Sequence, residues 1–188
     1  MGVAIASAAR RRGADVTLIA GHIEVSSPMG VKRIDVKSVR EMRDTVAISL
    51  EDADVLIMAA APADFRPVKA ADQKIKKSTN VPVIELERAE DILASTIDAR
   101  RSDAVIVGFA LETEDLLENA GRKLADKKLD LIVANDATEE GAGFGVDTNR
   151  VTLIGSDGSK EHLPLMSKEN LADVLLDRIE VIVNGRAR

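Results

Sequence analysis

The sequence has no cysteine, no tryptophan and no tyrosine among its 188 residues. Without cysteine the chain has no disulfide, no thiolate nucleophile and no cysteine-based metal site. No apolar run is long enough to cross a bilayer. At the N-terminus the arginines follow the apolar stretch, which is the wrong order for a secretory signal. These absences lead us to expect a cytoplasmic protein that does not enter a membrane.

Positive charge is also scarce, because 26 basic residues face 32 acidic ones and the net charge is -6. A negative chain exerts no overall attraction on nucleic acid. We therefore expect no nucleic-acid partner, and any bound anion must be held by local lysines and backbone amides. The two histidines, His22 and His162, have no partners at metal-ligand spacing and are expected in surface turns.

Aliphatic runs alternate with helical patterns along the chain. Helices are expected over 3–12, 39–50, 91–100, 114–128 and 168–183, and strands over 15–20, 31–36, 55–61, 81–86, 104–110, 131–134 and 151–154. Apolar strands separated by helices are typical of a parallel sheet covered on both faces. The sequence therefore predicts one α/β domain over residues 1–188, with a Rossmann-like, doubly wound and mainly parallel sheet. Ligands of such sheets bind at the carboxyl ends of the strands.

The only three aromatic residues are expected near that edge of the sheet. Phe65 and Phe109 fall at or after predicted strand ends, and Phe144 falls in a glycine-rich loop. Flat apolar rings suit both core packing and base stacking. The three rings therefore either cap the core or contact a nucleotide.

The segment 59–77 reads AAAPADFRPVKAADQKIKK and follows a predicted buried strand. Small residues at a strand end let a ligand approach the backbone closely. Asp64 can accept hydrogen bonds from a ribose or base, bind a cation, or merely cap a turn. Lys74, Lys76 and Lys77 are either a solvated loop or the cations of a phosphate-binding lid. Beside a small-residue strand end in an acidic protein, we favour the lid.

Two further segments follow predicted strand ends. The first, 108–113, reads GFALET and offers backbone N–H groups at a helix start. Behind it, Lys123 and Lys127 share one helix face, where they either contact a ligand or belong to a salt-bridged surface. The second, 133–136, reads VAND, and its Asn135 either reaches into a site or simply ends the strand.

Taken in order, these motifs resemble phosphopantothenoylcysteine synthetase over essentially the whole chain. They are AAAPADFRP, KIKK, GFALET, the lysine pair 123 and 127, and VAND. The resemblance implies a ligase of coenzyme A biosynthesis that joins 4′-phosphopantothenate to cysteine through an acyl-cytidylate, with CTP as co-substrate and Mg²⁺ as cofactor. It also implies a homodimer, and in bifunctional members a flavin-dependent decarboxylase domain in the same polypeptide.

The resemblance also assigns roles to residues of this chain. Lys74 would be catalytic, stabilising the reacting acyl centre. The nucleotide would contact Met58, Ala59, Ala60, Asp64, Lys74, Glu90, Asp91, Ile92, Leu93, Phe109, Lys123 and Lys127. Asn135 would lie on the substrate side, and no metal ligand is assigned. Glu90 stands where the family has a proline.

The family usually begins with a strand and an Asn-x-Ser-Ser-Gly-Lys-x-Gly turn, and this sequence starts where that turn would end. We expect the chain to lack a central strand and a phosphate-binding loop, and to bind nucleotide weakly as it stands. Two rival functions remain: another Rossmann-type NAD(P)-binding enzyme, and a non-catalytic dimerising domain. The sequence argues against the first of these functions, because residues 20–23 read AGHI and do not supply the G-x-G-x-x-G turn of an NAD(P)-binding enzyme.

Overall fold

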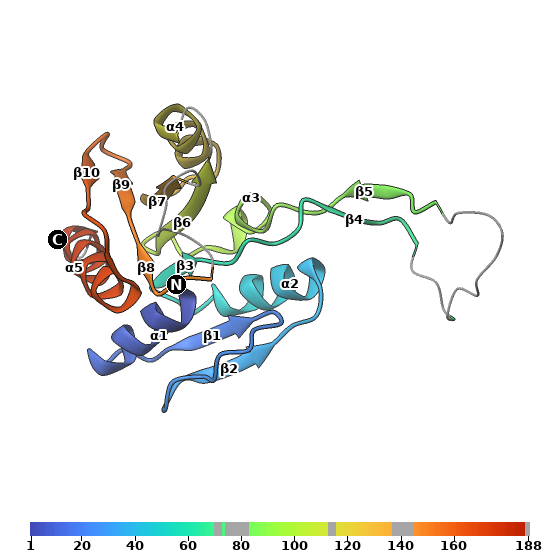
Figure 1. Cartoon of the computed structure of the whole chain (residues 1–188), viewed down its shortest axis with the longest axis horizontal. Helices are drawn as coiled ribbons and strands as arrows, with labels where there is room; N and C mark the ends of the chain where they lie inside the picture. The colour runs from blue at the N-terminus through green and yellow to red at the C-terminus, as the bar shows by residue number, and fades with distance from the viewer. Residues whose placement is uncertain (70–72, 74–82, 113–115, 137–144, 187–188) are drawn as a thin grey trace.

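The computed structural model describes residues 1–69, 73, 83–112, 116–136 and 145–186 (Figure 1). Its helices are α1 (Gly2–Arg11), α2 (Val39–Ser49), α3 (Ile92–Ser95), α4 (Leu116–Asp126) and α5 (Lys168–Arg186), with a 3₁₀ turn at Ile97–Ala99. Its strands are β1 (Thr17–Ala20), β2 (Lys32–Asp35), β3 (Val55–Met58), β4 (Phe65–Pro67), β5 (Leu86–Arg88), β6 (Val105–Glu112), β7 (Leu131–Asp136), β8 (Thr148–Asn149), β9 (Val151–Gly155), β10 (Lys160–His162) and β11 (Met166–Ser167).

The main sheet has five strands in the order β10-β9-β7-β6-β3. Strands β3, β6 and β7 are parallel, whereas β9 and β10 pair antiparallel at one side. The aliphatic run of β6 is buried on both faces, as a central parallel strand requires. The predicted α/β class with a mainly parallel sheet is confirmed. The short β10 was not predicted, because its Lys-Glu-His sequence has the polarity of an exposed edge.

Two layers of helices cover this sheet (Figure 1). Side chains alternate along each strand, so Ile106 and Ala110 of β6 belong to a core with α2, α3 and α4. Val105 and Val107 of the same strand belong to a second core with α1 and α5. We call these sides of the sheet the α3/α4 face and the α1/α5 face.

Strands β1 and β2 form a separate parallel pair. Within the described residues no ladder joins β1 to β3. Helix α2 nevertheless packs in one core with Ile19 of β1 and Leu56 of β3, and α1 contacts β1 while packing beside Val55. Helices α1 and α2 thus pack across both β1 and β3 from opposite faces, although these two strands are not paired with each other in the described part of the chain. Among the residues that the structure describes, the pair β1-β2 and the five-stranded sheet are joined through helix packing.

Strands β4 and β5 form an antiparallel arm that projects from the body (Figure 1). Arg66 and Glu87 face each other across it, with Nη2 and Oε1 2.9 Å apart. The predicted strand over 81–86 is wrong: 81 and 82 lie outside the described residues, and β5 starts only at Leu86, opposite Pro67. Pairing with β4 sets these bounds, and proline is tolerated there because both strands are edges.

The predicted helix over 91–100 is interrupted. The Thr96 hydroxyl donates to the Ile92 carbonyl at 2.7 Å, and the chain continues as a 3₁₀ turn. None of the helices in the described part of the chain combines the length and hydropathy that crossing a bilayer requires.

Candidate active site

A pocket of about 390 Å³ opens at the carboxyl ends of β3, β6 and β7. This is the edge where doubly wound sheets bind their ligands. Every described residue assigned to the nucleotide lines this one pocket: Met58, Ala59, Ala60, Asp64, Glu90, Asp91, Ile92, Leu93, Phe109, Lys123 and Lys127. Asn135 lines it too. Lys74 lies outside the described residues. The structure therefore gathers the predicted residues in one place, while their individual roles stay predictions.

The pocket reaches both faces of the sheet. Ile92 and Leu93 belong to the α3/α4 face, where Lys123 of α4 and Lys127, directly after its end, line the pocket. On the α1/α5 face the pocket is lined by Phe109, which packs with the second core. Both halves offer a cation that suits anionic groups, because Lys168 at the start of α5 also lines the pocket, and the ring of Phe109 adds a surface that suits uncharged groups.

Small residues build the wall that follows β3. Residues 59–63 read AAAPA, and all five line the pocket. Without long side chains this wall leaves the backbone open to close approach by a ligand. Beyond it, the Ala89 N–H donates to the Asp64 carbonyl at 2.8 Å, which fastens the base of the arm beside the pocket.

The phenylalanines do not share one location. Phe109 lines the pocket, as expected, and Phe144 lies outside the described residues. Phe65 is not part of the pocket lining and its side chain is 55 % exposed on β4. Its predicted position at the ligand-binding edge is wrong, because β4 turns the chain away from the sheet directly after Asp64.

An ion pair joins α3 to α4 within the pocket wall. Asp91 caps α3 through a hydrogen bond from the Ala94 N–H at 3.1 Å, and its other oxygen lies 2.7 Å from Lys127 Nζ. Partial burial raises the pKa of Asp91, but the hydrogen bonds from Lys127 and Ala94 outweigh it. The net result is an Asp91 pKa below its usual value, so this carboxylate is charged at neutral pH.

The Asp91 pair predicts a pH dependence of stability. Because the pKa of Asp91 is lower in the folded state than in the unfolded chain, its contribution is complete above about pH 4 and is lost as the pH falls through the lowered value. Asp91→Asn keeps the cap but cannot titrate. We expect the stability advantage of the wild type over Asp91→Asn, measured by urea unfolding, to shrink between about pH 5 and pH 2. The exposed Asp98→Asn is the control, and an advantage that does not change with pH would contradict the assignment.

Glu90 makes an ion pair that the family's proline could not make. Its Oε2 lies 3.2 Å from Nε of Arg43 on α2. Arg43 also pairs with Asp44, at 2.8 Å. The carboxylate thus connects the pocket rim to α2, and a nearby cation offsets its negative charge.

Arg100 organises the site, although its sequence context gave no signal. Its Nη1 donates to the carbonyls of Lys127 and Lys128 at 2.9 and 3.1 Å, and its Nη2 donates to the Leu93 carbonyl. One guanidinium therefore ties the end of α4 to α3. In the sequence it stands next to Arg101 and resembles an ordinary surface charge. Burial lowers the pKa of Arg100, against the opposing effect of Asp130 and Asp91.

A non-glycine residue in the left-handed region ends α4. Lys128 has a φ of 49°, and the Leu129 N–H donates to the Leu124 carbonyl at 2.9 Å. This is the helix-ending motif that usually employs glycine. It stops α4 at Asp126, two residues before the predicted end, and turns the Lys128 carbonyl toward Arg100.

Asn149 is the second residue that sequence reasoning missed. It lies in β8, is 1 % exposed, and hydrogen-bonds to Asn135 within the pocket lining. A single asparagine before an aliphatic strand belongs to no motif, so only the folded chain reveals the contact.

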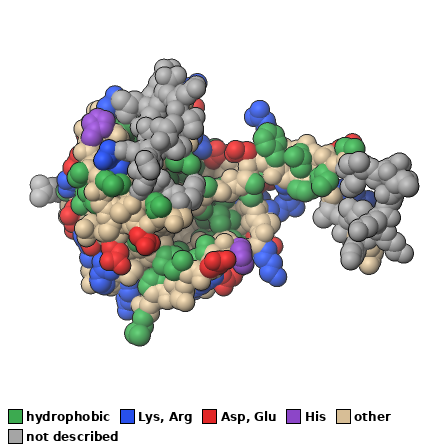
Figure 2. Space-filling view, in the orientation of Figure 1, with side chains coloured by type: hydrophobic (Ala, Val, Ile, Leu, Met, Phe, Trp, Pro, Cys, Tyr) green, Lys and Arg blue, Asp and Glu red, His purple; other side chains and the backbone are tan. Residues whose placement is uncertain are grey.

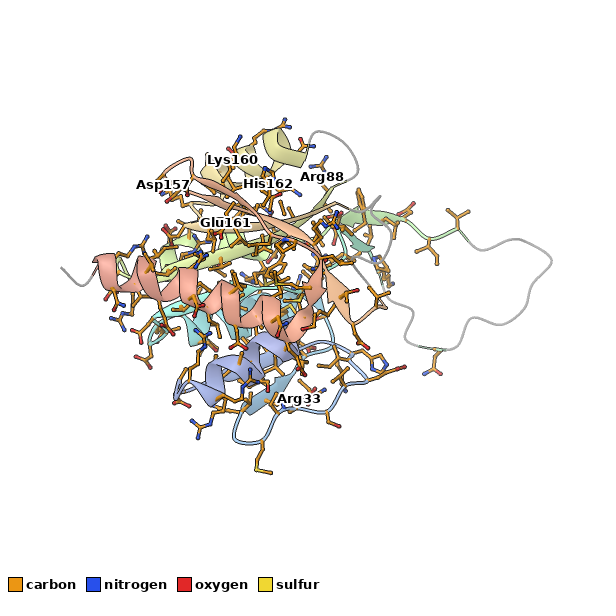
Figure 3. The ribbon with its side chains drawn as sticks, turned by 60° about the vertical axis from the view of Figure 1, so that its left-hand side comes forward. Arg33, Arg88, Asp157, Lys160, Glu161 and His162 are labelled. Atoms are coloured by element: carbon orange, nitrogen blue, oxygen red, sulfur yellow. The ribbon has the colours of Figure 1, made fainter. Side chains whose placement is uncertain are left out.

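The histidines take no part in this pocket. Figure 3 shows His162 with Lys160 and Glu161 on β10, at the edge of the main sheet. His162 Nδ1 lies 2.8 Å from the Thr152 hydroxyl, and Glu161 pairs with Arg178 at 2.8 Å. Both His22 and His162 are exposed, as expected, but His162 belongs to a strand instead of the predicted turn.

The described residues fit a Mg²⁺ ion only in company with a ligand. Among them, no group of three histidine, aspartate or glutamate side chains lies close enough to hold a metal. Mg²⁺ commonly takes one or two carboxylates together with substrate phosphates. Glu90 and Asp91 are engaged in ion pairs, so Asp64 is the pocket carboxylate best suited to a Mg²⁺ that arrives with a nucleotide.

Comparison with known proteins agrees with this architecture. Residues 1–182 match the model of the DNA/pantothenate metabolism flavoprotein C-terminal domain. The chain is 43% identical over 183 residues to the coenzyme A biosynthesis bifunctional protein CoaBC of Bacillus subtilis (strain 168), covering 97% of this chain and 45% of that one. It is 44% identical over 195 residues to CoaBC of Mycobacterium tuberculosis (strain ATCC 25618 / H37Rv), covering 98% and 46%.

A solved structure shares the fold as well. The crystal structure of the C-terminal domain of CoaBC superposes with a TM-score of 0.80 at 34% identity, covering 98% of this chain and 82% of that one. The chain spans about half the length of the curated relatives it matches. The resemblance found in the ordered motifs is confirmed, and the chain belongs to the family of the DNA/pantothenate metabolism flavoprotein C-terminal domain, which the coenzyme A biosynthesis bifunctional proteins contain.

Proposed function

We propose that this chain is a ligase unit that joins 4′-phosphopantothenate to cysteine, with CTP activating the carboxylate as an acyl-cytidylate. The main support is the pocket at the strand ends, which brings together all eleven described residues assigned to the nucleotide. Family membership supports the same reaction, because the relatives are named for coenzyme A biosynthesis. The flavin-dependent decarboxylase partner and the cytoplasmic location stay predictions.

The proposed reaction has two steps, which the two halves of the pocket suit. In the first, the carboxylate of 4′-phosphopantothenate attacks the α-phosphorus of CTP, and pyrophosphate leaves. In the second, the cysteine amine attacks the acyl carbon, and CMP leaves with the bonding electrons. Lys123, Lys127 and Lys168 line the pocket, where their charges suit the phosphates. Mg²⁺ held by the nucleotide and Asp64 would supply further neutralising charge.

Several groups in the pocket are held in position before a ligand arrives. Lys127 is anchored by Asp91 at 2.7 Å and is only 25 % exposed. A positioned cation stabilises developing negative charge without reorganising during the reaction. Holding two reactants in one pocket supplies a further part of the rate enhancement. These features favour a catalytic domain over a purely dimerising one.

A thermal-shift experiment separates this function from its rivals. A ligand that binds only the native state raises the melting temperature. We expect CTP with Mg²⁺ to raise it more than ATP with Mg²⁺ or NADPH does, and the mixture of three substrates to yield 4′-phosphopantothenoylcysteine by mass spectrometry. Tight NADPH binding without a response to CTP would identify an NAD(P)-dependent enzyme. Dimerisation without any nucleotide response would identify a non-catalytic domain.

The arm formed by β4 and β5 supports the proposed homodimer. Apolar side chains gather along it (Figure 2). Five of them are more than half exposed: Phe65 at 55 %, Val68 at 53 %, Val83 at 88 %, Ile84 at 65 % and Leu86 at 58 %. A contiguous apolar patch on a projecting element is typical of an association surface, and a two-stranded ribbon has free edges for pairing. A second copy of the chain would cover the apolar patch and pair with the free strand edges.

The arm yields a test of the homodimer. Ile84→Asp together with Leu86→Asp places two charges on the apolar arm, where association would bury them at high cost. We expect sedimentation velocity to show a dimer for the wild type and a monomer for this double variant. Val181→Asp is the matched control, because Val181 is 69 % exposed on α5, away from the arm. A wild type that sediments as a monomer would refute the proposal.

A further inference from the structure

Two buried asparagines meet in the half of the pocket that lies on the α1/α5 face. Asn135 is the penultimate residue of β7 and is 8 % exposed, while Asn149 in β8 is 1 % exposed. Nδ2 of Asn135 lies 2.9 Å from Oδ1 of Asn149, and both residues line the pocket. The other amide atom of Asn135, its Oδ1, is fully buried and has no hydrogen-bond partner in the described part of the chain.

A neighbouring backbone group fixes the orientation of both amides. The Arg150 N–H lies 3.1 Å from the amide atom of Asn149 that contacts Asn135. A backbone N–H can only donate, so this atom of Asn149 must be oxygen. An oxygen that accepts from Arg150 can only accept from Asn135 as well, so the Asn135 atom facing it must be the NH₂ group. The carbonyl oxygen of Asn135 is therefore left as the atom available to a ligand in the pocket.

An unpartnered acceptor selects what can bind beside it. Buried polar atoms without partners are rare in proteins and need an explanation. A carbonyl oxygen attracts N–H and O–H groups and repels phosphate or carboxylate oxygens. Lys123 and Lys127 line the pocket on the other face of the sheet, whereas Lys168 of α5 lines it on this one. The α1/α5 side of the pocket thus offers Asn135 as an acceptor for an uncharged or cationic donor.

We propose that Asn149 is a positioning residue, which holds the Asn135 amide so that its carbonyl oxygen accepts a hydrogen bond from an N–H or O–H group of the bound substrate. The identity of that substrate rests on the proposed function. Three sources share this donor chemistry: a ribose hydroxyl of CTP, an amide N–H of 4′-phosphopantothenate, and the amine of cysteine. Phosphate groups are excluded from this position.

The kinetics of four variants test whether Asn149 acts through Asn135, and they identify the substrate that donates the hydrogen bond. Asn135→Ala removes the acceptor and is expected to raise KM about 10-fold for one of the three substrates, which names the donor. Asn149→Ala should raise the same KM by a similar factor, because the Asn135 amide then rotates freely. Asn149→Asp keeps an oxygen facing Asn135 and should stay within about 2-fold of the wild type. The double alanine variant should match Asn135→Ala alone, since Asn149 acts only through Asn135.

A purely structural role would give a different pattern. Asn149→Ala would then lower the melting temperature with KM unchanged for all three substrates, as we expect of the control Thr152→Val. Thr152 is a buried polar residue of β9 that bonds to His162 outside the pocket. Unchanged KM values in Asn149→Ala, or additive effects in the double variant, would overturn the proposal.

Nuclear magnetic resonance separates failure of this inference from failure of the proposed function. The side-chain NH₂ signals of Asn135, assigned by their loss in Asn135→Ala, should exchange slowly with solvent in the wild type and at least about 10-fold faster in Asn149→Ala. A wild-type enzyme that forms no product refutes the ligase reaction but leaves this measurement intact. Fast solvent exchange of the Asn135 NH₂ group in the wild type would overturn the positioning role of Asn149, whichever reaction the protein catalyses.

Discussion

Replacing Lys74 with alanine is expected to lower kcat of cysteine ligation by about 100- to 1,000-fold, with a much smaller change in KM for CTP. Negative charge develops on the acyl oxygen when the cysteine amine attacks, and a positioned ammonium stabilises that charge more than it stabilises the ground state. The chain between β4 and β5 carries Lys74. The base of this arm is fastened at Asp64, beside the pocket wall, and Lys74 itself lies outside the described residues.

The same segment offers controls for Lys74. Lys76 and Lys77 carry the same charge two and three residues further on. Their alanine variants should retain ligation within about 3-fold, since the resemblance assigns a catalytic role to Lys74 alone and one charge without such a role contributes little. Equal losses at all three positions would indicate general attraction of anions by the segment. Unchanged turnover in Lys74→Ala would show that the catalytic assignment is wrong.

Replacing Arg100 with alanine is expected to destabilise the protein by about 2–4 kcal/mol and to raise KM for CTP. The guanidinium donates to the carbonyls of Leu93, Lys127 and Lys128, and all three lose a charged donor at once. Those carbonyls fix the distance between α3 and the end of α4. The ion pair from Asp91 to Lys127 spans the same gap, so we expect the pocket wall to loosen together with the fold.

Two comparisons make the Arg100 prediction specific. Arg100→Lys should recover little stability, because one ammonium cannot reproduce the planar fork that reaches both segments. Arg101→Ala should cost at most about 1 kcal/mol, because Arg101 makes exposed ion pairs with Asp103 and Asp54. The stability of each variant can be measured by urea unfolding, and its affinity for CTP by nucleotide titration. Similar losses for the two arginines would contradict the proposed bridge.

The sequence alone located the pocket because its evidence is local. Small residues after β3 and the glycine before Phe109 mark strand ends, and parallel strands bring their ends to one edge. The bounds of α1 and α2 were also predictable, because each of these helices has a clear periodicity of apolar residues. The predicted element types hold for these segments, and the residues assigned by resemblance to the nucleotide meet in one pocket wherever they are described.

What escaped prediction depends on contacts between distant parts of the chain. Arg100 works through carbonyls up to 28 residues away, and Asn149 through a side chain 14 residues away. Neither Arg100 nor Asn149 belongs to a recognisable motif of neighbouring residues in the sequence. The arm was misplaced for a similar reason: the limits of β5 follow from pairing with β4, and β4 itself is only three residues long.

The alternation of side chains along β6 has a consequence for how this site can diverge. Phe109 and Ala110 are neighbours in the sequence, yet they belong to opposite faces of the sheet and so to different halves of the pocket. On β7, Asn135 lines the pocket while its neighbour Ala134 packs in the core of the α3/α4 face. Selection for recognition of one substrate can therefore change one residue of each pair and leave its neighbour intact. For the proposed ligase we therefore expect preference for the nucleotide and recognition of the second substrate to be separately mutable traits.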